Sequence, residues 1–300
     1  MKVAITGAGG FVGSYLTDFF TGRGDEVTGI GRSRPANIAD DSLFTWIQAD
    51  TTQKGGWQDE IDAADVVINL AGKNIFGRWT EKIKQAILES RVRTTENVVD
   101  GFSGNSPAVL LSTSAVGYYG DRGEELLNES VGPGDDFLAQ VCIDWEGEAN
   151  RAADKGIRIV NMRFSMVLEK TGGALKMMLP AFKAFVGGPL GTGKQFMSWI
   201  HMADLIRAHS FVIEHAEVTG PVNCCAPHPV RNEAFTKTLG SVLGRPAFFR
   251  VPRFALSAAM GEMGEMVLSS QRAVPEKLLD HGFEFRFPEI RGALENILSQ

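Results

Sequence analysis

A chain of 300 residues is long enough for one domain with a second lobe built onto it, but short for two fully independent domains. Hydrophobic residues make up 44% and charged residues 22% of the sequence, as is typical of a globular protein with a packed core. The formal net charge of −6, without any long run of Lys or Arg, argues against a nucleic-acid partner, because binding phosphates needs clustered cations.

The first residues and the cysteines bear on compartment and metal binding. Residues 1–7 have the pattern of a buried strand and not of a signal peptide. No stretch approaches the roughly 18 apolar residues that a membrane span needs. Cys142, Cys224 and Cys225 lack the spacing of metal ligands, and we expect them to be buried. The sequence therefore predicts a cytoplasmic protein with no membrane association and no metal site.

Short apolar strands alternate with helical segments through the first half of the chain. Asp135 or Asp136 is placed to cap the last of these helices, and Gly101 and Gly156 are placed to end helices. This alternation predicts a doubly wound parallel sheet covered on both faces, a Rossmann fold. The expected strands are 3–6, 26–31, 43–49, 66–70, 109–112 and 157–163, and the expected helices are 14–22, 80–101 and 137–155.

The alternation breaks after residue 163. Glycine-rich segments bracket a helix around residues 177–182, and a strand at 196–200, a helix at 202–216 and a strand at 222–224 follow. The tail from residue 232 has a mainly helical pattern, with breaks at prolines. Because the late strand–helix–strand unit can rejoin the sheet, we expect two interleaved parts. They are a Rossmann domain, 1–168 with 195–225, and a smaller, mostly helical C-terminal lobe, 169–194 with 226–300.

A glycine-rich turn joins the first strand to the first helix. Gly7 permits the tight turn, Gly10 lets the backbone approach a pyrophosphate, and Gly13 lets the helix pack close to the strand. The N–H groups that begin the helix, around Phe11 and Val12, are suited to bind phosphate. Glycine also marks plain turns, but this pattern lies directly between an apolar strand and a helix, as a dinucleotide site requires.

The end of the second strand predicts which dinucleotide is preferred. NAD sites usually carry a carboxylate here for the ribose 2′-hydroxyl, whereas this chain has Arg32 and Ser33, which suit a 2′-phosphate. The sequence therefore favours NADP as the cofactor. The alternative is that the arginine is a solvated surface residue.

Two further strand ends are candidates for the adenosine half of the cofactor. Asp50 follows the third strand, and Leu70, Ala71 and Gly72 follow the fourth. Ligands of open α/β sheets bind at the carboxyl ends of the strands, so we expect these residues to contact adenosine. Asp50 is equally suited to cap the next element.

Several motifs together resemble one family. The spacing of Gly7, Gly10 and Gly13 is similar to that of the extended, NAD(P)-dependent epimerase/dehydratase branch of the short-chain dehydrogenase/reductase superfamily. More narrowly, the whole chain resembles the atypical "epimerase family protein" group with a C-terminal domain of unknown function. The segments that carry this resemblance are SAVGYYGDRG (114–123), DWE (144–146), GGAL (172–175), MSWIH (197–201) and PEKLL with GF (275–279, 282–283).

The resemblance implies a hydride-transfer site built from a Ser, a Tyr and a Lys four residues after the Tyr. Ser114 matches the Ser. The expected helix, 137–155, contains no Tyr, and its only Lys is its last residue. The alignment of this helix with the family can be anchored on Glu148 or on Glu146. The first choice places Gln140 and Asp144 at the Tyr and Lys positions, and the second places Leu138 and Cys142 there.

Other residues are then candidates for the missing chemistry. Tyr118 and Tyr119 are the nearest phenols to Ser114, although either ring can instead be a half-buried structural residue. Ser112 and Arg163 end strands that in relatives approach the cofactor. For Arg163 an ion pair within the protein is the alternative.

Two hypotheses follow for the function. In the first, the chain is an NADP(H)-binding oxidoreductase or nucleotide-sugar epimerase-like enzyme of unknown small-molecule substrate that lacks the Tyr-x-x-x-Lys pair. In the second, it binds NADP(H) without turnover, as a sensor or scaffold. The resemblance also implies a homodimer through the helices at 80–101 and 136–155.

Overall fold

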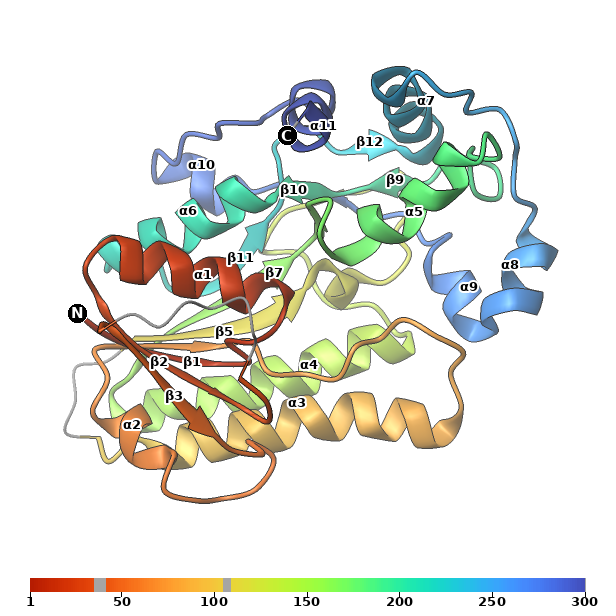
Figure 1. Cartoon of the computed structure of the whole chain (residues 1–300). Coiled ribbons are helices and arrows are strands. Elements are labelled where there is room, and N and C mark those ends of the chain that lie inside the picture. The colour runs from red at the N-terminus through yellow and green to blue at the C-terminus, as the bar shows by residue number, and fades with distance from the viewer. Residues whose placement is uncertain (35–41, 105–108, 300) are drawn as a thin grey trace.

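A seven-stranded parallel sheet forms the centre of the molecule (Figure 1). The computed structural model describes residues 1–34, 42–104 and 109–299. Across the sheet the strands run in the order β11-β7-β5-β4-β1-β2-β3, so the direction of winding reverses between β1 and β4. Ligands of such sheets bind outside the carboxyl ends of the strands at this switch point. The strands are β1 Lys2–Thr6, β2 Glu26–Gly31, β3 Phe44–Gln48, β4 Val66–Asn69, β5 Val109–Ala115, β7 Arg158–Phe164 and β11 Gly220–Cys224.

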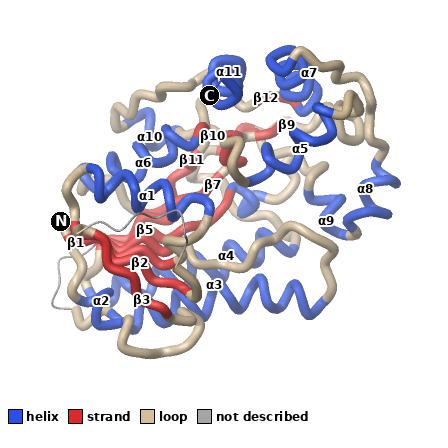
Figure 2. The backbone as a smooth tube through the Cα atoms, viewed as in Figure 1, coloured by secondary structure: helices blue, strands red, loops and turns tan. Residues whose placement is uncertain are grey.

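Helices cover both faces of the sheet, as Figure 2 shows. Helices α1 (Phe11–Gly22) and α6 (Met202–Glu214) lie on one face, and α2 (Gln58–Asp62), α3 (Glu81–Gly101) and α4 (Phe137–Asn150) lie on the other. The strands are apolar on both sides because each side of the sheet faces a helical layer. The doubly wound Rossmann fold predicted from the sequence is therefore confirmed.

The boundaries of these elements follow from local chemistry. The Thr80 side chain accepts a hydrogen bond from the Ile83 amide and begins α3, and Asp136 does the same for α4 through Ala139. Asp136, and not Asp135, is therefore the cap of α4. Gly156 has a φ of 74° and ends the segment that follows α4, a conformation that glycine adopts at little cost.

Three expectations need correction. The helix expected at 137–155 is α-helical only to Asn150 and continues as the tighter turn η2, Arg151–Lys155. The strand expected at 196–200 is two short strands, β9 (Phe196–Met197) and β10 (Trp199–His201), in separate two-stranded sheets. Of the late strand–helix–strand unit, only β11 joins the main sheet, since β10 pairs with β8 (Met166–Leu168).

The C-terminal part packs around its own apolar cluster. Helices α5, α7 and α11 contribute Leu175, Leu179, Phe235, Leu239 and Leu294 to this cluster. Strand β13 pairs with β6, which comes from the middle of the chain, and so ties this part to the Rossmann domain. The remaining elements are β6 Leu126–Leu127, η1 Val116–Tyr119, α5 Gly173–Lys183, β12 Val230–Arg231, α7 Asn232–Leu243, α8 Arg253–Met260, α9 Glu262–Met266, β13 Arg272–Ala273, α10 Glu276–Asp280 and α11 Ile290–Ser299.

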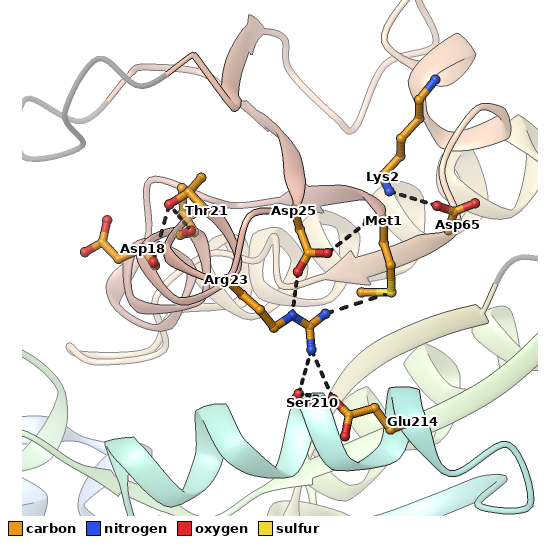
Figure 3. A network of polar contacts seen from close by, with 10 residues as sticks. Met1, Lys2, Asp18, Thr21, Arg23, Asp25, Asp65, Ser210 and Glu214 are labelled. Atoms are coloured by element: carbon orange, nitrogen blue, oxygen red, sulfur yellow. Dashed lines mark hydrogen bonds and ion pairs between the residues drawn. The ribbon is translucent and has the colours of Figure 1, made fainter.

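An ionic network joins α1 to α6 (Figure 3). Arg23 donates from Nε to Asp25 at 2.6 Å and from Nη1 to Glu214 and Ser210 at 3.0 Å each. Burial acts to raise the pKa of Asp25, but its hydrogen bonds to Arg23 and to the Met1 ammonium outweigh burial and lower it. The network links the end of α1 to α6. Within the described ranges, no helix combines the length and apolar character that crossing a bilayer demands.

Candidate functional site

Two clefts meet at the carboxyl ends of the central strands. Gly7, Gly10 and Gly72 line both of them, so together they form one continuous depression over the switch point. We name them the Ser114 cleft, with a volume of about 320 Å³, and the Arg32 cleft. The predicted residues that line the Ser114 cleft are Gly7, Gly10, Phe11, Val12, Gly13, Leu70, Gly72 and Ser114, and those that line the Arg32 cleft are Gly7, Gly10, Arg32, Ser33, Asp50, Ala71 and Gly72.

The glycine-rich turn is shaped for close approach of backbone to ligand. Gly7 has a φ of 72°, and a Cβ on Gly13 would lie 2.3 Å from the Gly7 carbonyl oxygen, so both positions exclude larger residues. Gly10 precedes α1, and no side chain caps that helix. The first N–H groups of α1 are therefore open to the clefts that Gly10, Phe11 and Val12 line. This arrangement fits a pyrophosphate.

The Arg32 cleft combines the cations Arg32, Lys73 and Arg93 with two carboxylates, Asp50 and Glu89. Asp50 accepts hydrogen bonds from the Thr52 amide at 3.1 Å and the Thr52 hydroxyl at 2.8 Å. These bonds, followed by the charge of Arg32, lower the pKa of Asp50. Asp50 therefore orders its own turn and also lines the cleft. Lys73 and Arg93, which sequence reasoning missed, add two cations to the same cleft.

Two buried polar atoms at these clefts lack protein partners. Thr113 lines the Ser114 cleft and Trp46 lines the Arg32 cleft, and the hydroxyl of the first and the indole nitrogen of the second are buried without a hydrogen bond among the described residues. Buried polar groups are rarely left unpaired in native proteins. Both atoms fit a site that a bound molecule completes.

Ser114 faces a mainly apolar wall. It is buried, and its hydroxyl donates a 2.6 Å hydrogen bond to Glu146 Oε1. Glu146 is in turn held by Arg163, whose Nε and Nη2 donate to the two carboxylate oxygens at 2.7 and 2.8 Å. Sequence reasoning did not select Glu146, although the DWE segment that contains it was part of the family resemblance.

Helix α4 turns an apolar face toward Ser114. Leu138 and Cys142 line the cleft, whereas Gln140 and Asp144 bond each other at 2.8 Å on the exposed side. Of the two pairings that the sequence left open for the Tyr and Lys positions, only Leu138 with Cys142 lies at the cleft. Burial raises the pKa of the Cys142 thiol to about 11. Neither side chain can act as an acid at neutral pH.

The structure does not bring the two predicted phenols into the cleft. Tyr119 is fully buried, and its hydroxyl lies 2.8 Å from Asn223 Oδ1 and 3.1 Å from Asn128 O, the two acceptors for its single proton. Burial raises its pKa to about 12, which makes it a weaker acid. The guanidinium of Arg163 lies 3.5 Å from the ring centroid of Tyr118. Tyr119 belongs to this buried network through its hydroxyl, as the structural alternative expected, and the Tyr118 ring packs on the same guanidinium.

Ser112 and Arg163 also lie away from both clefts. The Ser112 hydroxyl is buried in β5 with no hydrogen-bond partner among the described residues. Arg163 is 3% exposed, and its N–H groups donate hydrogen bonds to Glu146 and to the Tyr119 hydroxyl. Arg163 therefore forms the internal ion pair that the sequence left open as the alternative, and its contact with cofactor stays a prediction.

Arg91 is a further residue that sequence reasoning missed. It lines the Ser114 cleft from the middle of α3, where its position resembles that of any polar residue on a long amphipathic helix. Its guanidinium lies 5.1 Å from the ring of Trp145. The spacing of residues gave no indication of this contact, because the contact depends on how α3 packs against α4.

The fold and the paired clefts define a Rossmann-type α/β protein with a site of dinucleotide shape. The chain belongs to the NAD dependent epimerase/dehydratase family, whose model matches residues 3–225. Residues 251–297 match a domain of unknown function, DUF1731. The family resemblance noted in the sequence is thereby confirmed, including its C-terminal domain.

Relatives and solved structures agree with this assignment. The chain is 39% identical to an epimerase family protein SDR39U1 homolog, chloroplastic, from Arabidopsis thaliana, over 99% of this chain and 87% of the relative. It is 38% identical to epimerase family protein YfhF of Bacillus subtilis, over 100% and 98%. The crystal structure of human epimerase family protein SDR39U1 with NADPH superposes with a TM-score of 0.87 at 31% identity, covering 100% of both chains.

Proposed function

We propose that this chain binds NADPH across the two clefts and reduces the carbonyl group of a small molecule seated beside Ser114. The observation that carries the proposal is the continuity of the depression from Arg32, past the glycine turn, to Ser114. The human relative of similar length and fold was crystallised with NADPH. At the end of β2 the chain has Arg32 where a carboxylate would favour NAD.

Each part of the depression has a role in this proposal. The open amides of α1 bind the pyrophosphate, Arg32 and Ser33 bind the 2′-phosphate, and Asp50 and Ala71 enclose adenosine. When bound, NADPH supplies a hydride to the carbonyl carbon, while the carbonyl oxygen takes a proton from solvent. When its proton turns from Glu146 toward the cleft, the Ser114 hydroxyl donates to the substrate oxygen and positions it, and the apolar residues of α4 pack against the substrate.

Parallel titration with NADPH and NADH tests the cofactor assignment. A molecule that binds only the folded state raises the thermal midpoint by an amount set by its affinity. We expect NADPH to stabilise the protein more than NADH at equal concentration. Equal or better stabilisation by NADH would overturn the assignment of Arg32, and no stabilisation by either would overturn the proposal as a whole.

One observation favours a second candidate, a non-catalytic NADPH-binding sensor or scaffold. Leu138 and Cys142, which cannot donate a proton, occupy the cleft positions that the resemblance assigns to Tyr and Lys. Oxidation of NADPH stimulated by a carbonyl compound and lost in Ser114→Ala supports the enzyme. Tight NADPH binding without turnover of any carbonyl compound supports the sensor.

A further inference from the structure

The Ser114 cleft contains a single fixed charge. Among the described residues that line it, Arg91 is the only one charged at neutral pH, and most of the others are apolar. The apolar walls come from α3, α4 and the ends of β7 and β8, and include Ile87, Val141, Phe164 and Val167. Such a cleft suits a mostly apolar molecule that carries one negative charge.

Arg91 is held in place without a counter-ion. Its Nη1 donates to the carbonyl oxygens of Lys73 and Ile87, each at 3.0 Å, and its guanidinium lies over the Trp145 ring. Trp145 is itself fixed by a 2.9 Å hydrogen bond to the Thr95 hydroxyl. No carboxylate in the described part of the chain lies within ion-pair distance of Arg91. Burial lowers its pKa to about 10, so it remains a cation at neutral pH.

A cation that is partly removed from water and has no carboxylate partner is a costly feature for a protein to keep. An acidic neighbour would lower the free-energy cost of burying this charge, as Glu146 does for Arg163 behind Ser114. The five donors of a guanidinium form a planar fork that matches a carboxylate, and Nε and Nη2 of Arg91 make no hydrogen bond within the described part of the chain. The position is therefore prepared for an anion from outside the chain.

We propose that Arg91 binds the carboxylate of an otherwise apolar oxo acid in the Ser114 cleft. The inference rests on the proposed function and narrows its substrate class. Arg91 and Ser114 line the same cleft, so a carboxylate bound at Arg91 leaves the adjoining carbonyl group inside the cleft that Ser114 lines. A nucleotide sugar fits less well, because its many hydroxyl groups need polar partners that these walls do not offer.

The cofactor's own phosphates are the competing source of negative charge. Arg91 lines the Ser114 cleft and does not line the Arg32 cleft, where Lys73 and Arg93 supply cations. The phosphates also have the open N-terminus of α1. The phosphates therefore have cations and open amides of their own, and the effect of Arg91→Met on NADPH binding separates the two sources of negative charge.

Calorimetric titration of the full chain, with and without saturating NADPH, tests the inference. The probes are pyruvate, 2-oxo-4-methylpentanoate and 2-oxo-4-phenylbutanoate, together with the uncharged ethyl ester of the last. We expect affinity to rise with apolar size and to fall by roughly 10- to 100-fold in Arg91→Met, with partial recovery in Arg91→Lys. The ester should bind the wild type and Arg91→Met equally.

Lys82→Met, which removes an exposed cation from the same helix, is the matched control and should bind like the wild type. Far-ultraviolet circular dichroism establishes that each variant is folded. The inference is overturned if none of the three acids binds, if binding does not depend on Arg91, or if Arg91→Met instead weakens NADPH by a similar factor. Failure of the wild type to bind NADPH is a separate result, which overturns the proposed function.

Discussion

The hydroxyl of Ser114 donates a 2.6 Å hydrogen bond to Glu146. Ser114 lines the cleft, whereas Glu146 does not. A hydroxyl whose proton points at a carboxylate presents its lone pairs to the other side. Ser114 therefore offers the cleft an acceptor unless its proton rotates away. Because Glu146 is also paired with Arg163, the geometry of Ser114 depends on a buried ion pair.

The first prediction concerns that ion pair. Replacing Glu146 by Gln leaves the Arg163 guanidinium, which is 3% exposed, without a carboxylate. Removing one partner of a buried pair costs about 3–5 kcal/mol. We expect the free energy of unfolding, measured by urea denaturation, to fall by that amount.

The matched control is the double variant Glu146→Leu with Arg163→Met, which removes both charges together. Replacing a buried pair by apolar residues of similar volume is often close to neutral. The double variant should therefore be more stable than either single variant. Single variants that each lose less than about 1 kcal/mol would show that the pair is not buried as described.

The second prediction concerns cofactor preference. Changing Arg32 to Ala removes the cation nearest the expected 2′-phosphate while leaving the glycine turn intact. A charge-assisted hydrogen bond contributes about 1.5–3 kcal/mol, so NADPH affinity should fall roughly 10- to 100-fold and NADH affinity should stay the same. Fluorescence titration measures both. Arg34→Ala, two residues further along and outside both clefts, is the control, and an equal loss there would refute a specific role for Arg32.

Much of the fold could be predicted because buried parallel strands have a simple pattern. Residues 26–31 were predicted with the bounds that the structure has, and most of the other strands and helices of the first half differ from prediction by a few residues. The strand expected at 196–200 was wrong, because its two halves pair with different partners, β12 and β8. The local periodicity of a strand does not indicate which distant strand it pairs with.

The site was predictable where backbone geometry defines it. Gly7, Gly10 and Gly13 could be placed because a turn between a strand and a helix constrains them directly. Tyr119 and Arg91 could not, because their environments arise from packing between segments. Tyr119 meets Asn223, 104 positions away, whereas Arg91 meets Trp145 on the neighbouring helix.

The third prediction compares two glycines of α1. A Cβ on Gly13 would lie 2.3 Å from the Gly7 carbonyl oxygen and 2.7 Å from the Cα of Ala8, and both of these are backbone atoms that cannot move independently. Nothing lies within 4 Å of a Cβ on Gly22. We expect Gly13→Ala to destabilise the protein by more than about 2 kcal/mol and Gly22→Ala to stabilise it by about 0.5–1 kcal/mol. Urea denaturation measures both, and similar effects of the two would contradict the close packing of α1 on β1.

The fourth prediction concerns acid stability and His209 in α6. The ring is fully buried, its Nδ1 contacts the Leu205 carbonyl oxygen at 2.8 Å, and burial lowers its pKa to about 4. The unfolded chain takes up a proton near pH 6.5 and the folded chain does not, so stability is complete above pH 6.5 and declines as pH falls toward 4. The loss from this residue is about 3 kcal/mol, and His209→Leu should remove it. Urea denaturation between pH 4 and 7.5 measures the effect, with His215→Leu at the end of the same helix as control. An unchanged pH dependence in His209→Leu would show that this ring is protonated, or reached by water, in the folded protein.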